Sequence, residues 1–154
     1  MPAKHNNASR MHKLSIQEKI FISATQLSDY VLVEKNQLLS VWGMTALQYN
    51  ALSVLYSEDR NDEGLPSREI GKRLYTRVPD VTRLLDRLAD KGWVTRKRDA
   101  KNRRVVRTQL TQIGLELVES IYMPLKELEE SLFDHLSNEK KEMLEVLLKE
   151  SLIK

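Results

Sequence analysis

The chain has 154 residues, no cysteine and a net charge of only +3. This length is enough for one domain with its own hydrophobic core. The absence of cysteine excludes disulfides, thiolate nucleophiles and cysteine-ligated zinc sites. No apolar stretch is long enough to cross a bilayer and no secretory leader opens the sequence, so we expect a cytoplasmic protein without a membrane partner.

The charge is distributed unevenly along the chain. Residues 66–111 hold 14 lysines and arginines against five aspartates and glutamates and carry +9, while the remainder carries −6. A concentrated positive field is typical of a surface that meets phosphate, because each neutralised phosphate releases condensed counterions. Nucleic acid is therefore the first partner to consider. The alternative at this point is a solvated basic face with no partner.

The first part of the chain predicts an arm followed by two helices. Residues 1–13 are polar and lack a period, which predicts a disordered arm. Residues 14–39 carry apolar side chains at helical spacing, and residues 44–56 do so again. The polar stretch 57–64 predicts a loop.

Two short helices are predicted next. Pro66 fits the first position of a helix that runs to about Tyr75, and Pro79 can open the second helix. Gly92 ends the second helix as a left-handed C-terminal residue would. This second helix has one apolar face, formed by Val81, Leu84, Leu85 and Leu88. The opposite face is free to touch another molecule and holds Thr82, Arg83, Asp86 and Arg87.

A hairpin and two further helices complete the chain. Residues 93–98 and 104–110 alternate as strands do, and the polar residues between them suit a hairpin tip. Thr111 can cap the next helix and Ser137 the last one. The apolar stripes of residues 14–39 and 115–154 can be filled within one subunit or by a second copy. Because a small helix-helix-hairpin domain rarely needs three further long helices for its own core, we favour a homodimer.

Several short stretches of this sequence resemble the MarR family of bacterial transcriptional regulators. They are Asp-Val-Thr-Arg-Leu-Leu-Asp-Arg-Leu at 80–88, Lys-Gly-Trp-Val at 91–94, the pair Arg103 and Arg104, and Leu-Thr-Gln-Ile-Gly at 110–114. The resemblance extends over nearly the whole chain and implies a mainly α-helical fold with a small β wing. It implies a single domain over 14–154, with a winged helix-turn-helix reader at 44–114 and dimerisation helices at 14–39 and 115–154.

The resemblance also implies a function. A homodimer would bind a pseudo-palindromic operator in double-stranded DNA and act as a repressor, with each recognition helix in a major groove and each wing at the flanking minor groove. Within that arrangement Arg83 is the first candidate for base contact, since a guanidinium matches guanine O6 and N7. Arg87 lies a turn deeper and would pair with an acid or a phosphate. The full set of candidate DNA contacts is Arg68, Thr76, Arg77, Thr82, Arg83, Arg87, Lys101, Arg103 and Arg104.

The wing departs from the family pattern at one position. Lys101, Arg103 and Arg104 are the candidates for the minor groove, where narrow A·T-rich stretches attract arginine. Family wings usually carry an acidic residue two positions before the arginine that Arg104 matches, and here that residue is Asn102. The task of holding Arg104 would then fall to Asp99 or to no residue.

Three aromatic residues are candidates for an effector site. Family members commonly bind small phenolic or aromatic effectors between the dimer helices and the reader, which makes Tyr30, Trp42 and Tyr49 candidates for such a site. Aromatic residues at helical spacing more often belong to the core.

Other function classes have little support in the sequence. No glycine-rich phosphate loop, paired carboxylates or Ser/His constellation indicates an enzyme. The three histidines have no spacing that would form a metal site, so we expect no metal and no cofactor. The remaining alternatives are a winged-helix module that binds proteins and an architectural protein that binds DNA without sequence preference. An RNA-binding role is disfavoured because the strands lack an aromatic pair for base stacking.

Overall fold

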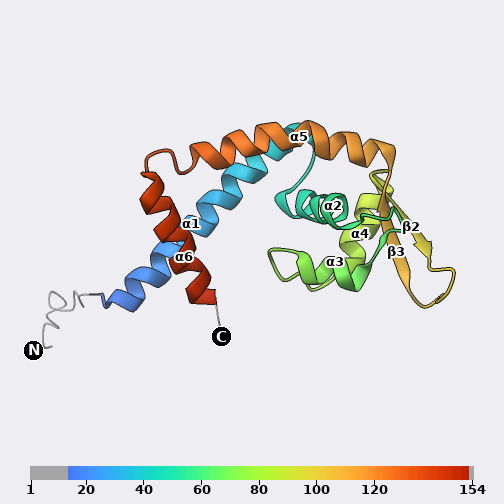
Figure 1. Cartoon of the computed structure of the whole chain (residues 1–154), viewed down its shortest axis with the longest axis horizontal. Helices are drawn as coiled ribbons and strands as arrows, with labels where there is room; N and C mark the ends of the chain where they lie inside the picture. The colour runs from blue at the N-terminus through green and yellow to red at the C-terminus, as the bar shows by residue number, and fades with distance from the viewer. Residues whose placement is uncertain (1–13, 153–154) are drawn as a thin grey trace, which may run out of the picture.

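The computed structural model describes residues 14–152, which form a mainly helical molecule with one small sheet (Figure 1). The expected arm at residues 1–13 lies outside the described part of the chain. Within residues 14–152, no helix is both long and apolar enough to cross a membrane. In chain order the elements are α1 (Ile16–Leu39), the 3-10 turn η1 (Ser40–Trp42), α2 (Ala46–Glu58), β1 (Leu65–Pro66), α3 (Ser67–Arg73), α4 (Val81–Asp90), β2 (Val94–Arg98), β3 (Val106–Leu110), α5 (Gln112–Ser131) and α6 (Asn138–Leu152).

These elements form two parts. Figure 1 shows α2, α3, α4 and the sheet gathered at one end of the molecule, with the β2–β3 hairpin at its outer edge. Helix α1 contacts both α2 and α5, and the long helices carry the chain away to the end where α6 lies. The helix-helix-hairpin order that the sequence predicts for residues 66–110 is confirmed as a winged helix-turn-helix.

The helix ends follow from local sequence. Thr111 accepts a hydrogen bond from the backbone N–H of Gly114 at 3.0 Å, which confirms it as the cap of α5. Ser137 accepts from the N–H of Lys140 at 3.4 Å at the start of α6. Gly92 has φ +73°, which confirms that α4 ends in a left-handed glycine.

The core lies between α2, α3, α4, α5 and the sheet. The predicted apolar face of α4 is confirmed, since Leu84, Leu85 and Leu88 are buried and Val81 packs against them. Each such leucine stabilises the fold by roughly 1.5–3 kcal/mol through its burial. The side chains that are almost fully buried include Leu39, Leu52, Leu55, Ile70, Leu85, Leu88 and Ile121.

The sheet contains a strand that the sequence analysis missed. Its order is β1-β3-β2, all antiparallel, and Leu65 and Pro66 of β1 pair with Thr108 and Arg107 of β3. The prediction that Pro66 opens a helix is therefore wrong by one residue, because Pro66 ends the strand in an extended conformation and α3 begins at Ser67. Proline suits an edge strand, where its missing N–H is not needed.

Four other predicted boundaries are also corrected. Helix α3 ends at Arg73 rather than near Tyr75, because the N–H of Tyr75 donates to the side chain of Asn50 instead of continuing the helix. Helix α4 begins after Asp80, which caps it, and not at Pro79. The hairpin strands begin at Val94 and Val106, because the tip forms a wider turn in which Val105 N–H bonds the Asn102 carbonyl.

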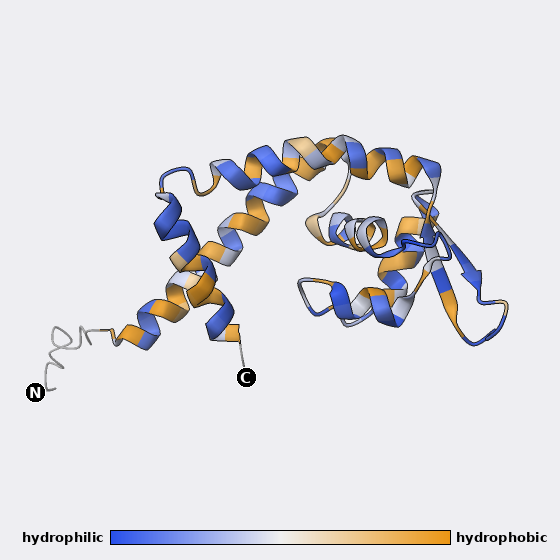
Figure 2. Cartoon of the chain, viewed as in Figure 1, coloured by the Kyte–Doolittle hydropathy of each residue, from blue (hydrophilic) through white to orange (hydrophobic). Residues whose placement is uncertain are grey.

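Large apolar side chains are exposed along α1 and α6. Figure 2 shows hydrophobic residues along α1 and α6, and α6 has no buried residue within the subunit. Phe21 on α1 is 73% exposed and Leu147 on α6 is 54% exposed. These faces are available to bury apolar surface outside the subunit.

Candidate nucleic-acid interface

Helix α4 presents its polar face at its N-terminal end. The carboxylate of Asp80 accepts a hydrogen bond from the backbone N–H of Arg83 at 2.9 Å and so fixes where the helix begins. Thr82 and Arg83 are exposed in its first turn, and Arg87 is exposed one turn later. Gly71 of α3 lies against the start of α4, so close that an added Cβ would meet the Val81 side chain at 2.9 Å. Close packing of α3 leaves the polar face of α4 pointing outward.

The turn between α3 and α4 is fixed by a buried amide. Asn50 on α2 is 6% exposed, and its Oδ1 accepts from the N–H of Tyr75 at 3.0 Å. Thr76 and Arg77 follow directly in this turn and are both exposed. Sequence reasoning missed Asn50, although an amide between Tyr49 and Ala51, past the capping turn of α2, was a signal that could have drawn attention to it.

Helix α4 is also tied to the wing. Asp86 on the polar face of α4 forms an ion pair with Arg96 of β2, whose side chain is largely buried. Arg96 also reaches the Ser67 hydroxyl at 3.4 Å, at the start of α3. The guanidinium thereby joins α3, α4 and β2, and sequence reasoning had not singled it out.

At the wing tip, Lys101, Arg103 and Arg104 are all exposed. The Asp99 carboxylate forms an ion pair with Arg107 and accepts hydrogen bonds from the backbone N–H groups of Lys101 and Asn102. These bonds, led by the one from Arg107, lower the pKa of Asp99 to about 2. Asp99 therefore forms no direct bond to Arg104, whose backbone N–H donates to the Asn102 side chain at 3.2 Å.

The charges of the basic segment divide into two groups. Four cations are paired within the fold: Lys72 and Arg73 with Glu69, Arg96 with Asp86, and Arg107 with Asp99. The basic candidates for DNA contact are all exposed, and none has an ion-pair partner among residues 14–152: Arg68, Arg77, Arg83, Arg87, Lys101, Arg103 and Arg104. Glu69, Asp86 and Asp99 thus pair with cations that are not DNA-contact candidates, and Asp80 caps α4.

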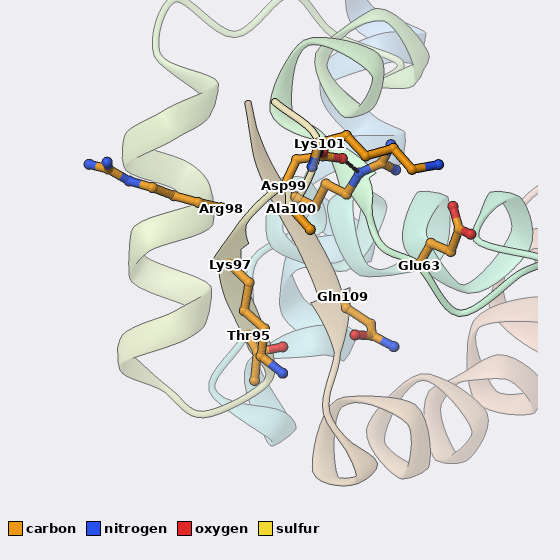
Figure 3. Close-up of a pocket in the computed structure, with 9 residues that line it drawn as sticks. Glu63, Thr95, Lys97, Arg98, Asp99, Ala100, Lys101 and Gln109 are labelled. Carbon is orange, nitrogen blue, oxygen red and sulfur yellow. Dashed lines mark hydrogen bonds and ion pairs between the residues drawn. The ribbon is translucent and has the colours of Figure 1, made fainter. Parts of the chain in front are cut away.

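A cavity of about 320 Å³ lies on the outer face of the wing, between the hairpin and the loop before β1 (Figure 3). Lys97, Lys101 and Glu63 contribute to its wall. In Figure 3 the side chain of Arg98 points to the side opposite Lys101 and Glu63. The two faces of the wing therefore both carry basic groups.

The three aromatic candidates for an effector site differ in how far they are buried. Tyr49 is buried in the core, where burial and nearby Glu129 raise the pKa of its phenol. Trp42 is half-buried against the same core, whereas Tyr30 on α1 is 50% exposed. A second cavity of about 540 Å³ lies between α5 and α6, and none of the three residues lines it or the wing cavity. Among the described residues, no three His, Asp or Glu side chains gather as a metal site would require.

Sequence and structure comparisons both find similarity to MarR-family proteins. A MarR family model matches residues 42–105, which span α2 to the wing. The multiple antibiotic resistance protein MarR of Salmonella typhimurium is 31% identical over 118 residues, covering 76% of this chain and 79% of that protein. The transcriptional repressor MprA of Escherichia coli K12 is 25% identical over 146 residues, covering 94% of this chain and 82% of its own.

A solved structure extends the likeness to nearly the whole molecule. The S. aureus MepR–DNA complex matches with a TM-score of 0.74 and 26% identity, covering 91% of this chain and 98% of the MepR chain. The likeness includes the long helices as well as the reader. The chain belongs to the MarR family of transcriptional regulators and has its winged-helix fold.

Proposed function

We propose that this protein is a sequence-specific DNA-binding regulator that represses transcription as a homodimer on a pseudo-palindromic operator. The observation that carries the proposal is a set of exposed cations, without acid partners among residues 14–152, on three parts of the reader. These are the first turns of α4, the turn before it, and the wing tip. A relative that is a repressor and a family member solved in complex with DNA support the same reading.

Each part of this surface has its own task in the proposal. Thr82 and Arg83 contact base edges in the major groove, and the Arg83 guanidinium forms a bidentate hydrogen bond with a guanine. Arg68, Thr76, Arg77 and Arg87 bind phosphates, which positions the helix without reading sequence. Lys101, Arg103 and Arg104 reach the flanking minor groove.

The dimer is proposed from the apolar faces that the subunit leaves exposed. Residues 14–39 and 115–154 form the dimerisation helices, and α1 and α6 bury Phe21 and Leu147 against a second copy. Two readers related by a twofold axis then contact half-sites about one helical turn, ~10 bp, apart. A dimer seated over a promoter excludes polymerase, which gives repression.

The proposal includes a small-molecule effector that changes how the two subunits of the dimer are arranged. A small aromatic or phenolic molecule that binds near Tyr30, Trp42 and Tyr49 would favour a differently splayed dimer and so release the operator. Of these three residues, Tyr30 offers exposed aromatic surface, being 50% exposed.

The proposal is tested by letting the protein choose among all sites of its own genome. Purified protein is mixed with sheared genomic DNA at ~0.15 M salt, where nonspecific phosphate contacts are largely competed away, and the bound fragments are sequenced. Enrichment of one pseudo-palindrome supports the proposal. Uniform recovery would instead identify an architectural DNA-binding protein, and failure to retain any DNA would favour a module that binds proteins.

A further inference from the structure

One carboxylate organises the tip of the wing. The Oδ1 atom of Asp99 accepts from the backbone N–H groups of both Lys101 and Asn102 at 2.8 Å, while its Oδ2 atom pairs with Nε of Arg107. A carboxylate that accepts several hydrogen bonds fixes the backbone that donates them. The conformation of the tip turn therefore depends on this one side chain.

Arg107 connects the turn to the body of the protein. It lies half-buried on β3, and its Nη1 donates to the carbonyl of Gly64 at 2.8 Å, in the loop before β1. Arg107 also lies directly across from Lys97 of β2, a pairing of like charges that is unfavourable without a counter-charge. Asp99 supplies that counter-charge through its ion pair with Arg107.

We infer that Asp99 and Arg107 are positioning residues for the wing's contact with DNA. Arg107 anchors Asp99 to the body of the reader, and Asp99 holds the turn in the conformation that presents Lys101, Arg103 and Arg104. This inference rests on the proposed function, since it assigns the wing a role in binding DNA. Arg107 then acts through Asp99 rather than by touching the nucleic acid.

Asn102 does not tie the wing tip to the rest of the fold. Its side-chain carbonyl accepts only the N–H of Arg104, at 3.2 Å and two residues along the same turn. A bond this local does not tie the tip to the rest of the fold. The Asp99–Arg107 pair does so, because Arg107 reaches the Gly64 carbonyl, 43 positions away in sequence.

The inference can be tested by whether one substitution strengthens or weakens binding to DNA. Asp99→Asn removes a negative charge from a basic surface, so electrostatics alone predicts tighter binding to DNA. Loss of positioning predicts weaker binding, because the tip must then be ordered at the moment of contact. Glu63→Gln is the matched control, since this exposed acid lines the same cavity but accepts no hydrogen bond from the wing tip.

Affinity is measured by fluorescence anisotropy on the operator fragment recovered from the genome. We expect Asp99→Asn to weaken binding about tenfold, the size of effect that follows loss of a charge-assisted hydrogen bond. Arg107→Lys, which keeps the charge but loses the guanidinium fork, should weaken binding in the same direction. Glu63→Gln should bind as well as the parent protein or better. Equal or tighter binding by Asp99→Asn would overturn the inference.

Amide hydrogen exchange provides a readout that needs no DNA. In Asp99→Ala, which removes the acceptor oxygen that an asparagine would keep, the amides of Lys101 and Asn102 should exchange faster than in the parent, while those of α4 stay protected. Unchanged exchange at these two amides would also overturn the inference. Failure of the parent protein to select any site would contradict the proposed function instead, a result that the exchange rates distinguish from failure of the inference.

Discussion

The side chain of Asn50 on α2 holds the backbone of Tyr75 in the turn that precedes α4. The two residues lie 25 positions apart, and the Oδ1 atom of Asn50 accepts from the Tyr75 N–H at 3.0 Å. Asn50 is buried, and its Nδ2 atom finds no partner in the described part of the chain. One buried amide thus links the core to the surface that carries Thr76 and Arg77.

Replacing Asn50 by leucine should therefore destabilise the protein. The Tyr75 N–H loses its acceptor, while removal of the unpartnered Nδ2 offsets part of the cost, so we expect a loss of about 1 kcal/mol in the free energy of unfolding. Chemical denaturation measures this directly. Tyr75→Ala is the control, because Tyr75 is 85% exposed and its backbone bond survives the change. Equal stability of Asn50→Leu and the parent would show that this hydrogen bond is not needed.

Truncation of Arg83 and truncation of Arg68 should change DNA binding in different ways. Arg83→Ala should cost roughly 1–3 kcal/mol of DNA affinity and relax the base preference at one operator position, because a bidentate base contact is lost. Arg68→Ala should weaken binding to all sequences alike and reduce the salt dependence, as loss of a phosphate contact does. Binding to operator and single-base variants over a range of salt separates the two. Unaltered sequence preference in Arg83→Ala would show that α4 is not the reading helix.

Gly114 should not tolerate a side chain. It lies in the first turn of α5, and a Cβ atom there would sit 2.0 Å from the carbonyl oxygen of Trp93, which is backbone and cannot rotate away. We expect Gly114→Ala to lower stability by about 1–3 kcal/mol, although glycine to alanine within a helix is ordinarily stabilising. Thermal and chemical unfolding measure the change. Ser120→Ala, at an exposed position of the same helix, should leave stability within about 0.5 kcal/mol of the parent.

The exposed faces of α1 and α6 should mediate dimerisation. A charge placed in a buried apolar interface is strongly unfavourable, so Phe21→Glu and Leu147→Glu should each shift the protein toward monomer. Sedimentation velocity over a range of concentrations gives the oligomeric state. Tyr75→Glu, on the reader, should leave the dimer unchanged. A dimer that survives both interface substitutions would place the contact elsewhere.

Acid should release the wing tip at a predictable pH. The pKa of Asp99 falls from 3.8 to about 2 on folding, so its ionised form stabilises the folded state above pH 3.8. That contribution is lost as pH falls through about 2, when the carboxyl is protonated in both states. The stability difference between the parent and Asp99→Asn should therefore be full near neutral pH and vanish near pH 2. A difference that stayed constant over this range would contradict the assignment.

Much of the fold could be predicted because helix faces and helix caps follow from local sequence patterns. The apolar face of α4 follows helical spacing, and the caps at Thr111 and Ser137 are recognisable from residue type alone. Strand β1 could not be predicted in this way, because it has two residues and one of them is a proline. Only its pairing with β3 makes it a strand.

The residues that hold the candidate site together were harder to find than the candidates themselves. Arg96 and Arg107 were counted as part of a basic segment, yet both are committed to acids of the framework. Sequence shows that a residue is charged but not which charges cancel, since that depends on contacts between distant elements. The nine candidate DNA contacts stay predictions, to which the structure adds their exposure.

The division of charge within the reader has a consequence for the protein before it meets DNA. Of the 14 basic side chains in residues 66–111, four are paired internally, and the like charges of the other ten, which have no ion-pair partner among residues 14–152, repel one another. Salt screens such repulsion, so the free protein should gain stability as ionic strength rises. The same salt weakens attraction to phosphate. Folding stability and DNA affinity should therefore respond to ionic strength in opposite directions.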